Sequence, residues 1–176
     1  MKVIFLDIDG VLNDFDTFRR CKTIYDRIGI RPVEIDEDKV INLKEIVNAT
    51  DAKIVLSSSW RIFCKKEDGK IVSKVKKMDD LMEIFNKYDL EIYDITPRSN
   101  SGRRQDEIIE WLIENKPEEY IVIDDDSADL GDFMRDEKLI KTSFYTNPDY
   151  GDSGLCERHV NDAIAKLGRV KCKKLK

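Results

Sequence analysis

Short apolar segments alternate with longer amphipathic ones along most of this chain. Five segments have the length and apolar content of buried strands, namely residues 3–6, 52–56, 91–95, 120–123 and 139–142. Runs of this kind, rich in Val and Ile, are typical of strands covered on both faces in a parallel sheet. Strands that alternate with helices predict right-handed crossover connections. We therefore expect an α/β fold of three layers, Rossmann-like, with about five parallel strands flanked by helices.

The connecting segments differ in how clearly they predict helices. Asp36 is a candidate N-cap for a helix that runs to about residue 50. Further helices are expected from Asp79 or Asp80 to Tyr88, from about residue 105 to Lys116, and from about residue 155 to residue 167. Residues 14–35 contain Arg31-Pro32, which disfavours a helix, so we expect an irregular flap there. Residues 62–78 are basic and show no hydrophobic periodicity that would assign them to a helix or a strand.

The first strand ends in a carboxylate, and a second carboxylate and a glycine follow at once. On a regular strand, Asp7 and Asp9 would point to the same face. Two carboxylates so close repel each other unless a cation lies between them. A divalent ion with oxygen ligands, most simply Mg²⁺, resolves this repulsion. Gly10 would let the chain leave the strand sharply. The alternative is a strand that merely ends in a turn containing Asp and Gly.

Two later strands also end in polar clusters. These clusters are Ser57-Ser58-Ser59 after the second strand and Asp124-Asp125-Asp126 after the fourth, and Arg103 and Arg104 open the helix between them. Since the carboxyl ends of parallel strands meet at one edge of the sheet, these groups can converge. Carboxylates hold Mg²⁺, a guanidinium and a hydroxyl neutralise phosphate oxygens, and an ionised carboxylate can attack phosphorus without a base. The pattern predicts phosphoryl transfer, although the serines alone also fit an N-capped turn and the acids a solvated loop.

Composition narrows the functional classes. No apolar run among the 176 residues is long enough to span a bilayer, and we expect one domain over residues 1–168. A strand that begins at the third residue leaves no room for a signal peptide, which favours the cytoplasm. Four scattered cysteines fit reduced thiols and no zinc site. The single histidine, His159, is expected on a helix surface and excludes most Ser/His/Asp and multi-His schemes.

The net charge of −5 is unevenly distributed. Residues 118–137 hold nine acids and one base, whereas the last eleven residues hold six bases and no acid. Residues 169–176 are therefore interpreted as a basic tail, which is either a solvated terminus or a contact for nucleic acid.

The polar clusters resemble the motifs of the haloacid dehalogenase (HAD) superfamily. DIDGVLN resembles its first motif, IVLS at residues 54–57 its second, Arg104 its third, and IDDD at residues 123–126 its fourth. The strings LSSSWR, RRQDEIIEWL and VIDDDS are similar to the small HAD domain associated with RNA-repair proteins, which is related to the phosphatase half of polynucleotide kinase-phosphatases. The resemblance implies a HAD-like fold with a minimal cap or none.

The resemblance also implies a role for each matching position. Asp7 would be the nucleophile that forms an aspartyl-phosphate, and Asp9 the general acid and base, with its backbone carbonyl on Mg²⁺. Ser57 would bind a phosphate oxygen. Ser58 and Gly10 would be further substrate-binding residues next to it. Arg104 would offset negative charge, and Arg103 is its rival for this role. Asp124 and Asp125 would complete the metal site, with Asp125 as the expected direct ligand; Asp126 permits a shift by one residue.

These roles predict a Mg²⁺-dependent phosphomonoesterase with an open crevice, because neither gap between motifs has room for a large cap domain. A nucleic-acid 3′-end is the leading substrate, and nucleotides and sugar phosphates are the alternative. An alternative of another class is a non-catalytic HAD-like binding module. No phosphate-binding loop for a kinase, no membrane contact and no obligate protein partner is evident in the sequence. Trp60 and Arg61 either stack on a base or sugar or, as we favour for Trp60, pack against the core.

Overall fold

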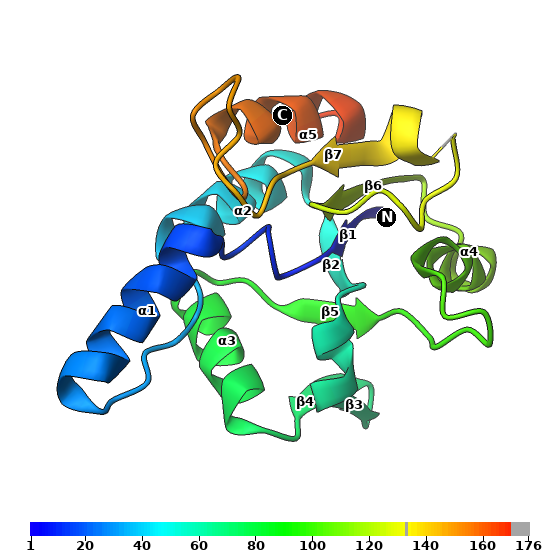
Figure 1. The fold of residues 1–176 in the computed structure, drawn as a ribbon. Helices are drawn as coiled ribbons and strands as arrows, with labels where there is room; N and C mark the ends of the chain where they lie inside the picture. Colours follow the sequence, from blue (N-terminus) through cyan, green and yellow to red (C-terminus); the bar gives the residue numbers. More distant parts are fainter. Residues whose placement is uncertain (133, 170–176) are drawn as a thin grey trace, which may run out of the picture.

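Five parallel strands form the central sheet, in the spatial order β5-β2-β1-β6-β7 (Figure 1). The computed structural model describes residues 1–132 and 134–169. The strands are β1 (Lys2–Leu6), β2 (Lys53–Leu56), β5 (Ile92–Ile95), β6 (Glu119–Asp124) and β7 (Leu139–Lys141). Leu6, the last residue of β1, is in register with Leu56 of β2 and Ile123 of β6. The polar residues that follow these strands therefore meet at one edge of the sheet.

Helices cover both faces of the sheet, which confirms the predicted three-layer α/β fold. One face carries α2 (Glu37–Thr50), α3 (Lys76–Lys87) and α5 (Glu157–Leu167), and the other carries α4 (Arg104–Asn115) (Figure 1). Alternate residues of β1 serve the two layers: Leu6 packs in the first core, whereas Phe5 meets the Trp111 ring of α4 edge-on at 5.3 Å between centroids. The carboxyl ends of the strands are thus packed between two hydrophobic cores, one on each face of the sheet.

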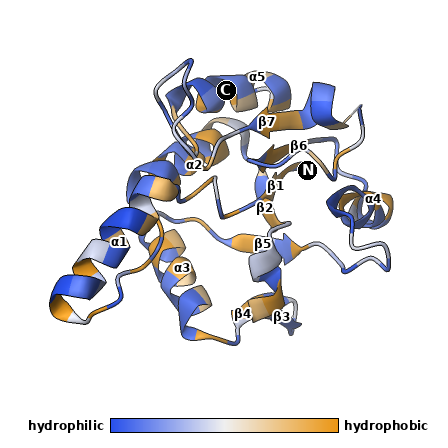
Figure 2. Ribbon diagram, in the orientation of Figure 1, coloured by the Kyte–Doolittle hydropathy of each residue, from blue (hydrophilic) through white to orange (hydrophobic). Residues whose placement is uncertain are grey.

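Residues 14–35 are not irregular throughout, contrary to expectation. Residues Phe15–Ile28 form α1, which stands away from the sheet (Figure 1). The Asp14 side chain caps this helix by accepting a hydrogen bond from the Thr17 amide at 2.8 Å. Only Thr17 and Cys21 of α1 are buried, and apolar residues such as Ile28 remain exposed among hydrophilic ones (Figure 2). The sequence contained a signal for α1, because apolar residues recur there with a helical period, at Phe15, Phe18, Cys21, Tyr25 and Ile28, and Arg31-Pro32 lies beyond the end of the helix.

The unassigned basic segment contains a β-hairpin. β3 (Cys64–Glu67) pairs antiparallel with β4 (Lys70–Ser73) around Asp68-Gly69, a pair of residues typical of two-residue hairpin turns. The segment follows a 3₁₀ turn, Ser59–Phe63. α3 begins at Lys76, before the expected Asp79 or Asp80, and its N-cap residue makes no side-chain capping bond. The remaining helices and sheet strands begin and end within two residues of the expected positions.

His159 is buried, so the expectation of a helix-surface residue is wrong. Its side chain is 4% exposed, and Nδ1 accepts a hydrogen bond from the Cys156 amide at 3.1 Å, which caps α5. Burial lowers the pKa of this imidazole. The histidine thus stabilises a helix end and lies outside the polar clusters that follow the strands.

Some sequence expectations concern parts of the chain beyond the described residues. Of the predicted basic tail, residues 170–176 lie outside them, as does Cys172. Cys21, Cys64 and Cys156 are free thiols, as expected. Within the described ranges, no helix has the length and apolar character to cross a membrane.

Asp14→Asn is expected to lower the free energy of unfolding at pH 7 by about 3 kcal/mol, because it removes a buried carboxylate from the Lys39 ammonium, 2.9 Å away. Burial raises the pKa of Asp14, but bonds from Ser153, Lys39 and Thr17 outweigh burial and hold it well below its usual range. A carboxyl with a lowered folded pKa stabilises the protein above its unfolded pKa, about 3.9, and loses this effect as the pH falls through the folded pKa.

Urea unfolding at pH 7 and pH 3 measures both effects. The wild type should lose more stability than Asp14→Asn between these two pH values. Asp16→Asn is the matched control, since Asp16 is half-exposed in α1 and pairs only with exposed Arg19. An equal loss of stability in wild type and Asp14→Asn would contradict this account.

Candidate active site

The ends of β1, β2 and β6 bring the three polar clusters together. The Asp7 amide continues the ladder by donating to the Ile123 carbonyl at 3.0 Å, and the Ser57 amide donates to the Leu6 carbonyl at 3.0 Å. The Asp124 carbonyl accepts from the Thr142 amide at 3.0 Å. Each cluster is therefore anchored by the sheet at the residue where its strand ends, so the side chains are positioned before any ligand arrives.

Three carboxylates converge at this edge. One oxygen from each of Asp7, Asp124 and Asp125 lies within 4.8 Å of the others. Asp7 and Asp124 are buried, and Asp125 is half-buried. Burial raises the pKa of Asp7 despite the neighbouring Arg104, and burial together with the Asp7 charge raises the pKa of Asp124 to about 7. Burial and Asp7 also raise the pKa of Asp125.

The carboxylates that converge are not all those that the sequence predicts. The Asp9 carboxylate is not among the three oxygens, because β1 ends at Leu6 and the chain has turned before Asp9. Among the described residues the Asp9 carboxylate joins no group of three converging ligands, and a cation between the carboxylates of Asp7 and Asp9 stays a prediction. Asp126 is also outside the cluster: its carboxylate accepts from the Ala128 amide at 2.8 Å and caps a turn.

Arg104 is the cation of this cluster. Its Nη1 lies 3.2 Å from Asp7 Oδ1 and also contacts Asp124 Oδ2. Burial lowers the pKa of this guanidinium, but the two carboxylates outweigh burial and raise it overall. Arg103, one residue earlier, is exposed at the N-cap position of α4. The geometry thus favours Arg104 over Arg103 as the residue facing Asp7.

Asp9 is held by two donors that the sequence did not indicate. Asn13 Nδ2 donates to Oδ1 and Trp60 Nε1 donates to Oδ2, each at 2.9 Å. Asn13 is fully buried and also donates to the Glu34 carbonyl at 3.1 Å. Both oxygens of Asp9 are therefore fixed in place. An aromatic residue directly after the serine cluster was the only sequence signal for this contact.

Ser57 and Ser58 have different surroundings. Both are fully buried. Ser57 Oγ has no hydrogen-bond partner among the described residues, whereas the Ser58 hydroxyl lies close enough to Asp7 to lower the pKa of that carboxyl. Ser58 also caps the 3₁₀ turn by accepting from the Trp60 amide at 3.3 Å, so the capped-turn alternative is correct for Ser58. The Ser57 hydroxyl is left free to donate to an incoming oxygen.

Trp60 and Arg61, which follow the serine cluster, hold the Ser57-Ser58 loop against the core and against α4. Trp60 is 2% exposed, which confirms the favoured core packing. Arg61 Nη1 donates to the carbonyls of Ser57 and Ser58 at 3.0 and 2.9 Å, and Nη2 lies 2.5 Å from the buried Glu107 carboxylate of α4. Arg61 therefore joins the serine loop to the helix that carries Arg104.

Gly10 provides the space that Asp125 occupies. Its φ of +77° is a left-handed conformation that side chains rarely adopt, and a Cβ built there would lie 2.6 Å from the Asp125 Cβ and closer still to its carboxyl group. Thr142 Oγ1 donates to the Gly10 carbonyl at 2.8 Å. The first and fourth motifs are thus in direct contact at this glycine.

Gly10→Ala is expected to displace the Asp125 carboxylate. We predict that the affinity of the three converging carboxylates for Mg²⁺ falls at least about tenfold, a typical effect of disturbing a ligand's surroundings. Calorimetric titration of the protein with MgCl₂ measures this change. Gly29→Ala is the matched control, since Gly29 has a similar φ of +71° but no atom within 4 Å of a built Cβ. An equal affinity for Mg²⁺ in both variants would contradict the prediction.

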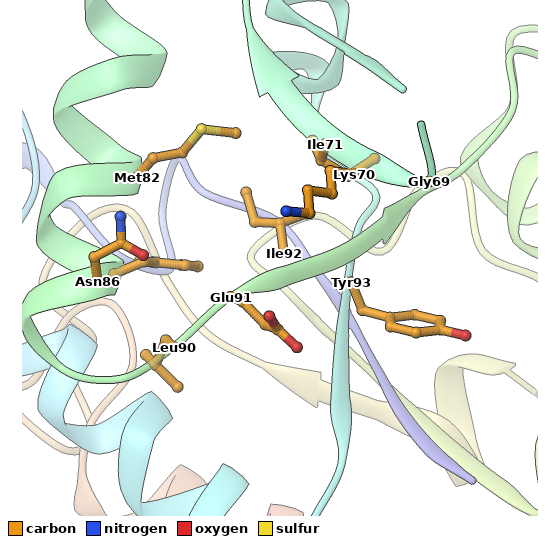
Figure 3. A pocket seen from close by; sticks show the side chains of 10 residues that line it. Gly69, Lys70, Ile71, Met82, Asn86, Leu90, Glu91, Ile92 and Tyr93 are labelled. Carbon is orange, nitrogen blue, oxygen red and sulfur yellow. The ribbon is translucent and has the colours of Figure 1, made fainter. Parts of the chain in front are cut away.

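A cavity elsewhere in the molecule contains none of these residues. It lies between β4, α3 and the approach to β5, where Met82, Ile71 and Ile92 point toward one another (Figure 3). Its volume is about 430 Å³. The three polar clusters are on other strand ends, so we place the candidate chemistry at the Asp7 edge and not in this cavity.

Comparison with known families agrees with the motifs and their arrangement. The sequence model of the family described as the HAD domain in Swiss Army Knife RNA repair proteins matches residues 3–147. Comparisons with curated proteins and with solved structures found no match. The matched range contains the first strand, the three polar clusters and Arg104. Family membership supports a HAD-type phosphatase in general terms. The chain belongs to the HAD domain family of Swiss Army Knife RNA repair proteins.

Proposed function

We propose that this chain is a Mg²⁺-dependent phosphomonoesterase that acts through an aspartyl-phosphate on Asp7. One observation carries the proposal. Asp7 lies among two further carboxylates and a guanidinium, while another acid, Asp9, is held separately by two neutral donors. The two aspartates of the first motif therefore have different surroundings, as a nucleophile and an acid–base group require.

The residues present fit a hard divalent cation. Asp7, Asp124 and Asp125 offer three converging carboxylates, and the pKa of each is raised. Burial therefore disfavours the ionised state that a nucleophile requires, and a cation among the three carboxylates would lower these pKa values. These carboxylates, with the Asp9 carbonyl that the resemblance implies, would hold Mg²⁺. When bound, Mg²⁺ would offset negative charge on the phosphate oxygens.

The proposed reaction has two displacements at phosphorus. In the first, an Asp7 carboxylate oxygen bonds to phosphorus as the ester P–O bond breaks, and Asp9 gives its proton to the leaving oxygen. In the second, water attacks phosphorus, Asp9 takes a proton from that water, and the bond from Asp7 to phosphorus breaks. Arg104 and the unpartnered Ser57 hydroxyl can bind the phosphate oxygens in both displacements.

For the substrate we propose a nucleic-acid 3′-phosphate end. The description of the family refers to RNA repair, which favours a polynucleotide. The segments inserted between the motifs are small here, α1 and the β3–β4 hairpin with α3, which is compatible with a bulky substrate. Nucleotides and sugar phosphates are the competing substrates. A non-catalytic binding module is disfavoured because the chain keeps Asp7, Asp9 and their surroundings.

Hydrolysis of p-nitrophenyl phosphate tests the reaction class. Turnover should require added MgCl₂ and fall by at least about 100-fold with EDTA, because loss of the metal removes several kcal/mol of charge stabilisation. Restoring excess MgCl₂ should restore the rate. Turnover that is indifferent to EDTA would contradict the metal-dependent proposal.

A substrate panel tests the substrate class. Initial rates would be compared for 3′-phosphate oligonucleotides, the same oligonucleotides with 5′-phosphates, nucleoside monophosphates and sugar phosphates. We expect the largest kcat/KM for the 3′-phosphate oligonucleotides. The polynucleotide proposal should be abandoned if these are the poorest substrates.

A further inference from the structure

A second polar pocket lies directly beside the serine loop. It has a volume of about 480 Å³ and is lined by residues of the end of β5, of the β3–β4 hairpin and of α4. Arg61 lines this pocket and also donates to the carbonyls of Ser57 and Ser58. One side chain thus separates the pocket from the loop of the candidate active site.

Two residues that line the pocket have buried polar atoms without partners. Thr96 is 2% exposed, and neither its Oγ1 nor the buried Arg61 Nε makes a hydrogen bond within the described ranges, although both atoms lie behind the pocket surface. Proteins leave few buried polar atoms unpaired, because such atoms lose their water without gaining a partner. In the described ranges only four side chains have such an atom, and Ser57, Thr96 and Arg61 are three of them. Two of the three, Thr96 and Arg61, line this pocket, and Ser57 belongs to the neighbouring loop, so donors without partners gather where the pocket meets the candidate active site.

The charge of the pocket indicates the kind of ligand that it favours. Its lining includes four bases and two acids, namely Arg61, Lys66, Lys74, Arg98, Asp94 and Glu114. Asp94 is already bonded by Lys66 Nζ and by Trp111 Nε1, each at 3.0 Å. Burial lowers the pKa of Arg61, and the paired Glu107 carboxylate raises it. Burial and the charges of Arg104 and Arg98 outweigh this pairing, so the pKa of Arg61 is lowered overall. The four bases of the lining exceed its two acids in a chain with a net charge of −5, which favours an anion as the ligand.

We propose that this pocket binds a second phosphate of the substrate, the phosphodiester adjacent to the terminal phosphate at Asp7. Guanidinium and hydroxyl donors are the usual partners of backbone phosphates, which follow one another at short intervals along a strand. The inference rests on the proposed function and makes it more specific. It explains how a protein with a small cap selects polynucleotide ends over small phosphate esters.

The test is the ratio of kcat/KM for a single-stranded oligoribonucleotide 3′-phosphate to kcat/KM for p-nitrophenyl phosphate. Thr96→Val, which removes the hydroxyl and keeps the shape, should lower this ratio about tenfold. Its thermal stability should be unchanged or higher, since the lost hydroxyl has no partner in the free protein. Lys66→Gln should also lower the ratio. Lys65→Gln is the matched control, because Lys65 pairs with Glu67 and does not line the pocket.

Several outcomes would overturn the inference. An unchanged ratio in Thr96→Val and Lys66→Gln would do so, and so would a clear loss of stability in Thr96→Val, which would indicate a structural hydroxyl. A free-phosphate site would instead change inhibition by inorganic phosphate while the ratio stayed constant. If the wild type hydrolyses no substrate, the proposed function fails first; anisotropy of a labelled 3′-hydroxyl oligoribonucleotide then still tests the pocket, with weaker binding expected in Thr96→Val.

Discussion

Replacing Asp7 by Asn is expected to lower kcat for p-nitrophenyl phosphate by at least about 10⁴-fold, within the range reported for removal of a catalytic nucleophile. The amide has nearly the shape of the carboxylate but cannot form the phosphoryl ester. It also removes the negative charge from one of the three carboxylates that converge at the sheet edge. Steady-state assay at saturating substrate and MgCl₂ measures the loss.

Asp126→Asn provides the comparison for Asp7→Asn. Asp126 belongs to the same acidic edge, but its carboxylate caps a turn and is outside the three converging oxygens. Its rate should stay within about threefold of the wild type, as expected for a surface change that touches no reacting group. A rate for Asp7→Asn within tenfold of the wild type would show that another group attacks phosphorus.

Replacing Asp9 by Asn is expected to have an effect that depends on the leaving group. For an alkyl phosphate, kcat/KM should fall by about 10³-fold, because the leaving alkoxide needs a proton from this residue. For p-nitrophenyl phosphate, whose leaving group is stable as an anion, the fall should be much smaller. Both partners of the Asp9 carboxylate are donors, so the amide would also turn its own N–H groups toward Asn13 or Trp60.

Trp60→Phe tests how much the position of the Asp9 carboxylate matters while its ability to transfer a proton is kept. This change keeps an aromatic ring in the core and removes the donor to Asp9 Oδ2, together with part of the ring volume that Lys77 covers. The same dependence on the leaving group should appear, with a smaller magnitude than in Asp9→Asn. Equal losses of kcat/KM for both esters in Asp9→Asn would argue against a proton donor at this position.

The sheet and its acidic edge could be predicted because their signals are local. Strands buried on both faces need continuous apolar runs, and the residues that end them stand next to these runs in the sequence. The apolar runs end at Leu6 and Ile123, and the residues that follow them are Asp7 and Asp124. Parallel topology then places the ends at one edge. The order of polar clusters along the chain was sufficient for this part of the site.

The partners of Asp9 could not be predicted, because they depend on distances across the fold. Trp60 lies 51 positions from Asp9, and its indole N–H reaches the carboxylate only after β2 is registered beside β1. Asp9 lies outside the carboxylate cluster for a similar reason. Its carboxylate would lie beside that of Asp7 only on a strand that stayed regular through Asp9, whereas β1 ends at Leu6. Arg103 and Arg104 likewise differ only in the direction each takes at the start of α4.

The missed elements are those that contribute little to the main core. α1 buries two of its residues, and the β3–β4 strands carry lysines on exposed positions. Hydrophobic periodicity is weak in the hairpin, which is short and closed by a tight turn, whereas α1 has a helical period although most of its apolar residues stay exposed. Asp14 and the Asp68-Gly69 pair were further signals for these two elements.

Arg61 and Glu107 are restricted in how they can change over evolution. Each is buried, and each would be left as an unpaired charge if the other were replaced, which is far more costly than losing both together. Their ion pair also joins the loop of Ser57 to the first turns of the helix that carries Arg104. A lineage can therefore replace this pair by an apolar contact only through two coordinated substitutions. The two positions are expected to co-vary among relatives, although they are 46 positions apart in the chain.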